Sequence, residues 1–371
     1  MNKLIWAAVV LTRLLAPELT LADESGGAAK PALQVYRAGG MSNERAAHQA
    51  TLLASGEVLI TGGCAGRGCD RILASAELYD PAEGVFRDAA PMSVPRVSHS
   101  ATLLADGRVL VTGGWTGQQT TAGSEIYDPA EEVWVAAADM TEARASHIAV
   151  SLGDGRVLIV GGGDGRLGNL ATAEVFEPAA GAFSAVGPMQ SNHYLATRLA
   201  DGRVLVTGGQ DATGELLRTA EIFDPATDEF RATGDMTVGR VKHAAALLAD
   251  GKVLIIGGSD SRGYRERFDS TEIYDPETEE FVTGPPMHWG RHKIRDAVAA
   301  LPSGAIVVAG GAARPEIYDP SRGTFVAAEG ALSGPQMFAT ATRLTNGEVL
   351  ILGGYDEHTR SSASAWLLRA R

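Results

Sequence analysis

Seven glycine pairs divide this chain into repeats of similar length. Each pair ends a short run of apolar residues, and the first glycines of successive pairs lie 43 to 53 residues apart. The pairs are Gly62-Gly63, Gly113-Gly114, Gly161-Gly162, Gly208-Gly209, Gly257-Gly258, Gly310-Gly311 and Gly353-Gly354. A period of about 50 residues is typical of propeller blades, each of which packs against its two neighbours.

Each repeat has the pattern of four strands. In the second repeat, the small residues 100–104 form one expected strand, and Asp106-Gly107 marks a tight hairpin turn. The β-branched run 109–112 is the next expected strand, and residues 125–127 are the third. Trp134 begins the fourth. We therefore predict an all-β chain of seven four-stranded blades.

The double glycine, the downstream aromatic residue and the Trp or Phe of the outer strand resemble the kelch repeat. The resemblance covers nearly all of the chain from residue 33 to residue 371. It implies a seven-bladed β-propeller of four-stranded kelch blades, formed by residues 33–371.

The outer strands indicate how such a ring closes. Seven glycine pairs are accompanied by six outer strands, which begin at Phe86, Trp134, Phe183, Phe230, Phe281 and Phe325. Residues 35–41 repeat the spacing of residues 86–92. We predict that this N-terminal segment supplies the outer strand of the seventh blade, since closure of this kind removes exposed sheet edges.

The N-terminus resembles a secretory signal. Residues 1–22 combine Lys3 with a short apolar run and end in a small residue, and we expect residues 23–32 to be a linker. The apolar run is shorter than the roughly 20 residues that a membrane span needs. We expect a secreted or periplasmic protein with no membrane span.

The cysteine count and the net charge restrict the partners. Cys64 and Cys69 are the two cysteines of the chain, and an exported protein is expected to join them as a local disulfide. Two thiols are too few for a metal site, so we expect no metal and no cofactor. A net charge of −13 disfavours nucleic acid as a partner. We expect a monomer.

A repeated arginine and histidine have a structural explanation. Arg45, Arg96, Arg144 and Arg240 each precede a histidine by three residues. We expect both side chains to bind the connections between blades, and the arginine to pair with the third-strand glutamate, such as Glu125 or Glu221. A ring of histidine metal ligands is the alternative. It is disfavoured because the inner strands lie too far apart for ligands to converge at about 2 Å.

Variable loops indicate where a ligand binds. The loop leading into each blade and the loop after each glycine pair share one face, which we term the upper face, and these loops differ most among blades four to seven. We predict an anion-binding rim formed by His193, Tyr194, Arg262, Tyr264, Arg265, Arg267, Trp289, Arg291, Lys293 and Arg295. An acidic glycan or an acidic peptide segment would suit it. The alternative is a solvated loop whose arginines are offset by Asp260, Glu266 and Asp269.

The resemblance also implies an enzymatic alternative. Some kelch propellers are copper-radical oxidases similar to galactose oxidase, and others are exported sialic-acid epimerases. A copper-radical site needs two tyrosines, two histidines and a cysteine crosslinked to one tyrosine, whereas both cysteines here share one loop. We therefore expect an exported binding module for a protein or glycan partner, with a carbohydrate-active enzyme as the alternative.

Overall fold

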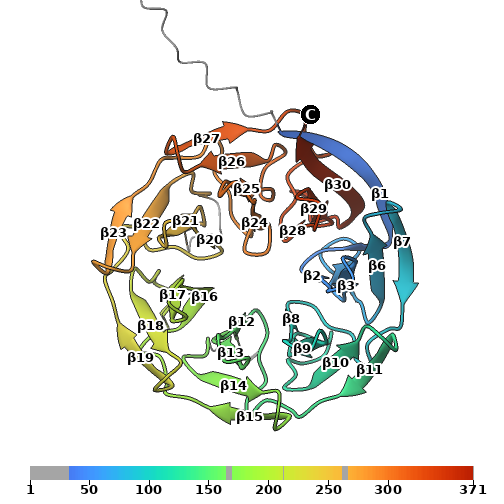
Figure 1. Cartoon of the computed structure of the whole chain (residues 1–371), viewed down its shortest axis with the longest axis horizontal. Helices are drawn as coiled ribbons and strands as arrows, with labels where there is room; N and C mark the ends of the chain where they lie inside the picture. The colour runs from blue at the N-terminus through green and yellow to red at the C-terminus, as the bar shows by residue number, and fades with distance from the viewer. Residues whose placement is uncertain (1–32, 164–168, 212, 261–265, 371) are drawn as a thin grey trace, which may run out of the picture. The chain divides into compact units, whose positions relative to one another are not determined.

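The strands of the computed structural model form seven four-stranded antiparallel sheets around a central axis (Figure 1). The structure describes residues 33–163, 169–211, 213–260 and 266–370. Every regular element in these ranges is a strand, and no helix there could span a membrane. The predicted seven-bladed β-propeller is confirmed. We number the blades from 1 to 7 by the order of their inner strands.

Each blade contains four strands, which we call the inner, second, third and outer strand in order from the axis outwards. The inner strands are β2 (Gln49–Leu52), β8 (Ser100–Leu103), β12 (Ile148–Ser151), β16 (His193–Arg198), β20 (Ala244–Leu247), β24 (Val298–Ala300) and β28 (Thr340–Arg343). The second strands are β3 (Val58–Thr61), β9 (Val109–Thr112), β13 (Val157–Val160), β17 (Val204–Gly209), β21 (Val253–Ile256), β25 (Ile306–Val308) and β29 (Val349–Leu352). The third strands are β6 (Ala76–Asp80), β10 (Ser124–Asp128), β14 (Ala173–Glu177), β18 (Ala220–Asp224), β22 (Thr271–Asp275), β26 (Glu316–Asp319) and β30 (Ser362–Ala370). The outer strands are β7 (Val85–Ala89), β11 (Val133–Ala136), β15 (Ala182–Ala185), β19 (Glu229–Ala232), β23 (Glu280–Thr283), β27 (Thr324–Ala327) and β1 (Leu33–Arg45). A small hairpin of β4 (Cys64–Ala65) and β5 (Arg71–Ile72) follows the first glycine pair.

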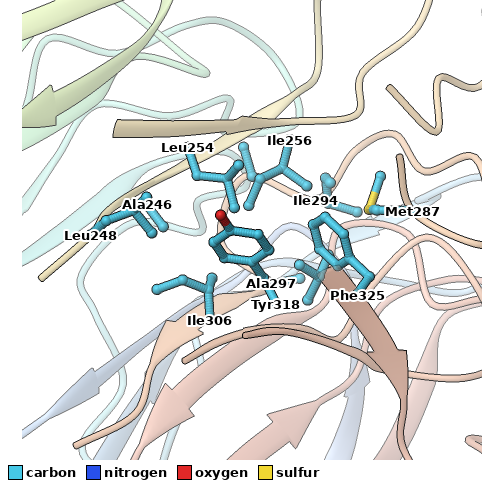
Figure 2. Close-up of a cluster of buried hydrophobic side chains, with 12 residues drawn as sticks. Ala246, Leu248, Leu254, Ile256, Met287, Ile294, Ala297, Ile306, Tyr318 and Phe325 are labelled. Carbon is cyan, nitrogen blue, oxygen red and sulfur yellow. The ribbon is translucent and has the colours of Figure 1, made fainter. Parts of the chain in front are cut away.

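The second strand of each blade is buried along its whole length. This explains its continuous apolar sequence, because both faces of the strand pack against neighbouring blades. Figure 2 shows the cluster between blades 5 and 6, where Leu254 and Ile256 of β21 face Tyr318 and Phe325 of blade 6. The two rings of that pair have centroids 5.2 Å apart. Equivalent pairs are Tyr79–Phe86, Tyr127–Trp134, Phe176–Phe183, Phe223–Phe230 and Tyr274–Phe281.

Blade 7 contains strands from both ends of the described chain. Strand β1 pairs antiparallel with β30, so that Val35 lies opposite Leu368 and Arg37 lies opposite Trp366. Val35 and Leu368 occupy the positions at which the other blades carry their aromatic pair. The predicted closure by residues 35–41 is therefore confirmed.

The glycine pairs allow neighbouring backbones to approach closely. Gly62 has a φ of +57°, and a Cβ there would lie 2.5 Å from the carbonyl oxygen of Arg96 in the next blade. Gly63 has a φ of +92°, and a Cβ would lie 2.8 Å from the carbonyl oxygen of Ala46. Side chains at these positions would clash with the backbone in addition to straining it, which explains the repeated glycines.

The repeated arginine and glutamate form a buried ion pair inside each of five blades. In blade 2, Nη2 of Arg96 lies 3.0 Å from Oε1 of Glu125, and Nη1 donates to the carbonyl of Gly113 at 2.8 Å. The other pairs are Arg45–Glu77, Arg144–Glu174, Arg240–Glu272 and Arg291–Glu316. These contacts confirm the predicted structural role, except at Glu221, where the prediction of an arginine partner is wrong because His193 occupies that place.

The repeated histidine connects adjacent blades. Nε2 of His99 lies 2.9 Å from Oγ1 of Thr61 in blade 1, and Nε2 of His243 lies 3.0 Å from Oγ1 of Thr207 in blade 4. The His48 ring makes the corresponding contact with Thr340 of blade 7. These contacts confirm that the histidines connect adjacent blades. The Nε2 atom of each of these three histidines contacts a threonine hydroxyl of the preceding blade.

Candidate binding site on the upper face

The leading loop of a blade lies beside the loop that follows its glycine pair. Isolated antiparallel bridges join Val97 to Trp115 in blade 2, and Val241 to Ser259 in blade 5. The two kinds of loop therefore share the upper face, as expected from the strand directions. All further site geometry concerns this face.

Six leading loops form a belt of backbone hydrogen bonds around the axis, which we call the axial collar. Its members are Ala47, Ser98, Ser146, Lys242, Lys293 and Phe338, and each has a φ between 51° and 57°. The amide of Ser98 donates to the carbonyl of Ala47 at 3.1 Å, and the amide of Ser146 donates to that of Ser98 at 2.8 Å. In the same way, the amide of Ala47 donates to the carbonyl of Phe338. The amide of Phe338 donates to the carbonyl of Lys293, whose own amide donates to the carbonyl of Lys242.

Blade 4 interrupts the axial collar. Counted back from the hairpin glycine, Ser191 occupies the position of the repeated arginine, and Tyr194 occupies that of the histidine. His193 replaces the arginine in space: its Nε2 lies 2.8 Å from Glu221, and its Nδ1 lies 3.1 Å from the carbonyl oxygen of Gly208. Among the described residues, no collar hydrogen bond passes through His193, which instead pairs with Gly209 as the first residue of β16.

A pocket of about 300 Å³ lies where the collar is interrupted. Its floor and walls come from blades 2 to 5, and Trp115 and Tyr194 contribute the aromatic surface. Polar lining residues are Thr120, Ser146, Asn169, Asn192, His193, Gln210 and Lys242. The Thr120 hydroxyl is buried and has no hydrogen-bond partner within the described chain. The described lining contains one lysine and no carboxylate.

A two-residue insertion in blade 6 reaches across the axis. The chain from Arg291 to Gly304 is two residues longer than the equivalent stretch from Arg240 to Gly251. Arg295 donates to the carbonyls of Ser146 and His147 in blade 3, at 3.2 Å each. It also pairs with the neighbouring Asp296, whose carboxylate accepts a hydrogen bond from Gln49 of blade 1 at 3.4 Å. The insertion thereby bridges blades 1, 3 and 6.

Positive charge gathers beside the pocket. Lys242 lines the pocket, and both burial and the charge of Lys293 lower the pKa of Lys242 to about 7. Burial and the charge of Arg267 likewise lower the pKa of Lys293. Nζ of Lys293 donates to the hydroxyl of Tyr355 at 2.7 Å. Burial, with a smaller effect of Tyr194, raises the pKa of Tyr355 to about 12, so this phenol stays neutral.

The structure brings together part of the predicted rim. Tyr194, Lys293 and Arg295 lie around the upper end of the axis, and His193 lies beneath Tyr194 against Glu221. Arg267 forms an ion pair with Glu357 of blade 7 at 3.2 Å. The predicted residues Arg262, Tyr264 and Arg265 lie outside the described residues.

Arg291 was predicted to form part of the anion-binding rim, but the structure places it in the interior of blade 6. Its side chain is fully buried, pairs with Glu316 at 2.8 Å and donates to the carbonyl of Gly310. Arg291 is therefore the repeated structural arginine of blade 6. Trp289 is 36% exposed and stacks near Arg291, but it does not line the pocket with Tyr194.

Several residues of this site escaped the sequence prediction. They are Trp115, Thr120, Asn169, Asn192, Gln210, Lys242, Phe338 and Tyr355. A signal for Lys242 was present in the sequence, because the residue before each repeated histidine is small in blades 1 to 3 and cationic in blade 5. The pocket itself had no such signal, since it depends on the path of the blade 4 backbone.

Cys64 and Cys69 stiffen another part of the upper face. The structure joins them in a disulfide across the β4–β5 hairpin, with their Cα atoms 4.9 Å apart. The intervening loop contacts blade 7, where the amide of Gly68 donates to the carbonyl of Thr359 at 2.8 Å. The loop thus adds to the contacts that join blades 1 and 7, which include His48 with Thr340 and Ala47 with Phe338.

The residues present do not fit a copper-radical site. Cys64 and Cys69 are bonded to each other, so neither is placed to crosslink to a tyrosine. The described residues contain no group of three His, Cys, Asp or Glu side chains that could hold a metal ion. We derive no chemistry through copper for this chain.

Comparisons with known proteins support the fold. The Kelch motif matches residues 47–93, 96–141, 193–237 and 240–288. One similar solved structure is a novel fungal alcohol oxidase of the AA5 family, in complex with copper; it is 17% identical, with a TM-score of 0.71 over 92% of this chain and 76% of that chain. No curated protein matches the sequence significantly. At this identity the structural likeness concerns the propeller alone.

Proposed function

The chain belongs to the kelch-repeat family of β-propellers, a common interaction module, and on this premise we propose that it is an exported binding module for an anionic ligand. The ligand would occupy the pocket at blade 4 and extend towards Lys293. An acidic glycan is the ligand class that we favour, with an acidic peptide segment as the competing outcome of the test.

One observation carries this proposal. In a chain of net charge −13, the described lining of the pocket contains Lys242 and no carboxylate, and Lys293 and Arg295 lie nearby. A surface that selects anions needs such local positive charge, because the overall charge of the protein repels them. Lysine alone would give a weak, salt-sensitive contact.

The other lining groups favour a sugar. Trp115 and Tyr194 offer aromatic surface, and the amides of Asn169, Asn192 and Gln210 can each donate and accept hydrogen bonds. Sugar rings present hydroxyls that both donate and accept, together with apolar faces that pack on aromatic rings. An acidic sugar would add a carboxylate for Lys242.

The test measures binding of an oligogalacturonate, its neutral methyl ester and a polyglutamate peptide by calorimetry. We expect the oligogalacturonate to bind and the methyl ester to bind at least tenfold more weakly. Lys242→Gln and Lys293→Gln should each weaken binding about tenfold or more, since a charged hydrogen bond contributes roughly 1.5 to 3 kcal/mol.

Lys252→Gln is the matched control. Lys252 follows a lower hairpin turn and pairs with Asp275 at 2.5 Å, so its loss should leave affinity unchanged. Binding of polyglutamate alone would assign an acidic peptide instead of a glycan. Equal affinity for the acidic and the esterified sugar would reject an anionic ligand in this pocket.

A further inference from the structure

Lys242 occupies an unusual place for a lysine. It belongs to the axial collar with a φ of +57°, it lines the pocket beside the interruption at blade 4, and it is partly buried. The backbone carbonyl of Lys242 accepts a hydrogen bond from the amide of Lys293 at 2.8 Å, which fixes the two lysines on adjacent blades. Their spacing is therefore set by the collar.

The surroundings of this amine favour its neutral form. Burial removes water from the ammonium group, and the positive charge of Lys293 adds repulsion. His292 also faces this cluster, and burial together with Lys293, Arg267 and Lys242 lowers the pKa of His292 to about 3, so its ring adds no charge. Arg267 acts on Lys293 from the adjoining loop.

Only a neutral amine can attack a carbonyl carbon. An ordinary lysine has a pKa of about 10.4, so fewer than about one amine in a thousand is neutral at pH 7. A pKa near 7 makes about half of the Lys242 amines neutral at that pH. Burial of a lysine next to another cation is a known way of activating it as a nucleophile.

We propose that Nζ of Lys242 forms an imine with aldehydes and keto acids that enter the pocket. The Nζ lone pair attacks the carbonyl carbon and forms a C–N bond, which gives a carbinolamine after proton transfer from nitrogen to oxygen. The hydroxyl then leaves as water, taking its proton from solvent, while the nitrogen loses its last proton to form the C=N bond. No oxidant or reductant is consumed. The inference shares the pocket with the proposed function but does not require affinity for anions.

The other described lysines provide a contrast. Lys252 is exposed and pairs with Asp275, which raises the pKa of Lys252 and keeps its ammonium protonated. Burial and Arg267 lower the pKa of Lys293 as well, but its Nζ donates to the hydroxyl of Tyr355 at 2.7 Å, and Lys293 does not line the pocket. Selective reaction at Lys242 is therefore expected.

The experiment treats the full chain with glyoxylate or propionaldehyde in the presence of cyanoborohydride, which reduces an imine to a stable amine. Peptide mass spectrometry then measures the labelled fraction of each lysine over time. At pH 7 we expect Lys242 to be labelled at least tenfold faster than Lys252. Its rate should rise with pH and level off above about pH 7, whereas that of Lys252 should continue to rise.

Two variants separate reactivity from folding. Lys293→Gln removes the neighbouring charge while leaving the nucleophile, and should slow labelling of Lys242 at pH 7 severalfold. Lys242→Arg keeps a cation in the pocket and should abolish the fast labelling without increasing that of Lys252. Melting temperatures would establish that both variants fold. Labelling of Lys242 no faster than that of Lys252 by both aldehydes would overturn the inference, whatever the affinity for oligogalacturonate.

Discussion

At the scale of single residues, the buried arginine–glutamate pair shows how the blades tolerate charge in their interior. Five blades retain both partners, and the two exceptions change the arginine position in different ways. In blade 4, His193 approaches Glu221, and both of its ring nitrogens face oxygen acceptors. In blade 7, Gln336 replaces the arginine and Trp366 replaces the glutamate. A glutamate is kept only where an arginine or a histidine can reach it, because a buried carboxylate without a partner is costly.

Replacing one member of an arginine–glutamate pair should therefore lower the free energy of unfolding more than replacing both members. Arg96→Met leaves Glu125 buried without its ion-pair partner, and we expect the free energy of unfolding to fall by about 3 to 5 kcal/mol. The double change Arg96→Met with Glu125→Leu should recover most of that loss. Chemical denaturation measures both variants.

The control for this pair is Arg108→Met. Arg108 forms an exposed pair with Asp106, and we expect its removal to cost less than about 1 kcal/mol. A double variant as unstable as Arg96→Met alone would contradict the explanation.

The repeated histidines make stability depend on pH. Burial, with nearby arginines, lowers the pKa of His48 and of His99 to about 3, and lowers those of His147 and His243 well below the ordinary value. The unfolded chain binds protons at these histidines below about pH 6.5, whereas the folded chain does not. Stability is therefore complete above pH 6.5 and is lost as the pH falls towards 3, by up to about 1.4 kcal/mol per pH unit for each histidine.

We expect His99→Gln to remove the contribution of one histidine to the pH dependence of the free energy of unfolding. The variant should be less stable than the parent at pH 7.5, but its free energy of unfolding should fall less steeply between pH 6.5 and pH 5. Denaturation curves at several pH values give both slopes. His358→Gln is the control, because it replaces a histidine with an exposed side chain. Identical slopes for the parent and His99→Gln would show that His99 titrates normally in the folded state.

At the scale of elements, β1 has a role that no other strand of the described residues shares. It covers the outer edge of β30, and its Leu33 and Val35 pack in the same cluster as Trp366 and Leu368. The amide of Val35 also donates to the carbonyl of Glu329 at 3.0 Å, which ties blade 7 to blade 6. Without β1, the backbone edge of β30 would be open to pairing with other molecules.

Deletion of residues 33–41 should therefore lower the melting temperature and cause aggregation. Size-exclusion chromatography and thermal denaturation would measure both effects. A chain that begins at residue 32 is the control and should remain monodisperse. If the deletion variant stays fully soluble with an unchanged melting temperature, β1 is not needed for closure.

A further prediction at the scale of elements concerns the disulfide between Cys64 and Cys69. The hairpin β4–β5 brings the two residues together, and we expect protein from the exported fraction to contain the disulfide. Mass spectrometry of non-reduced peptides should find Cys64 and Cys69 linked. Two free thiols in that material would reject the pairing.

The elements were predictable because they repeat. Strand order, closure by β1 and the Arg96–Glu125 pair all follow from positions that recur. Arg291 was wrongly predicted to belong to the rim because blade 6 has two extra residues between Arg291 and the hairpin glycine. Its distance from that glycine therefore differs from the distance of Arg240, the structurally equivalent arginine of blade 5. The pocket was not predictable, since His193 replaces the arginine in space without aligning with it in sequence.

At the scale of the whole molecule, the ring is regular in its core and asymmetric on one face. The axial collar links six blades, and the interruption at blade 4 coincides with the pocket that Lys242 and Tyr194 line. Blade 6 adds Arg295, which connects opposite sides of the ring. The uniform blades form the repeated core, and the deviating blades carry side chains of the proposed site.

The last prediction concerns export of the whole chain. We predict a mature protein that begins near Asp23, because residues 1–22 resemble a secretory signal. Intact-mass measurement of protein from the exported fraction should give the mass of residues 23–371. Retention of residues 1–22 in that fraction would contradict the predicted cleavage.

The pairing of β1 with β30 also sets an order of events during synthesis. A ribosome adds roughly 5 to 20 residues per second, so more than 300 residues of translation separate the two strands by about 15 to 60 seconds. Throughout that interval β1 lacks the strand with which it pairs, and six blades can form before blade 7 is complete. A chain truncated before β30 would therefore have six complete blades, and β1 would lack the strand with which it closes the ring.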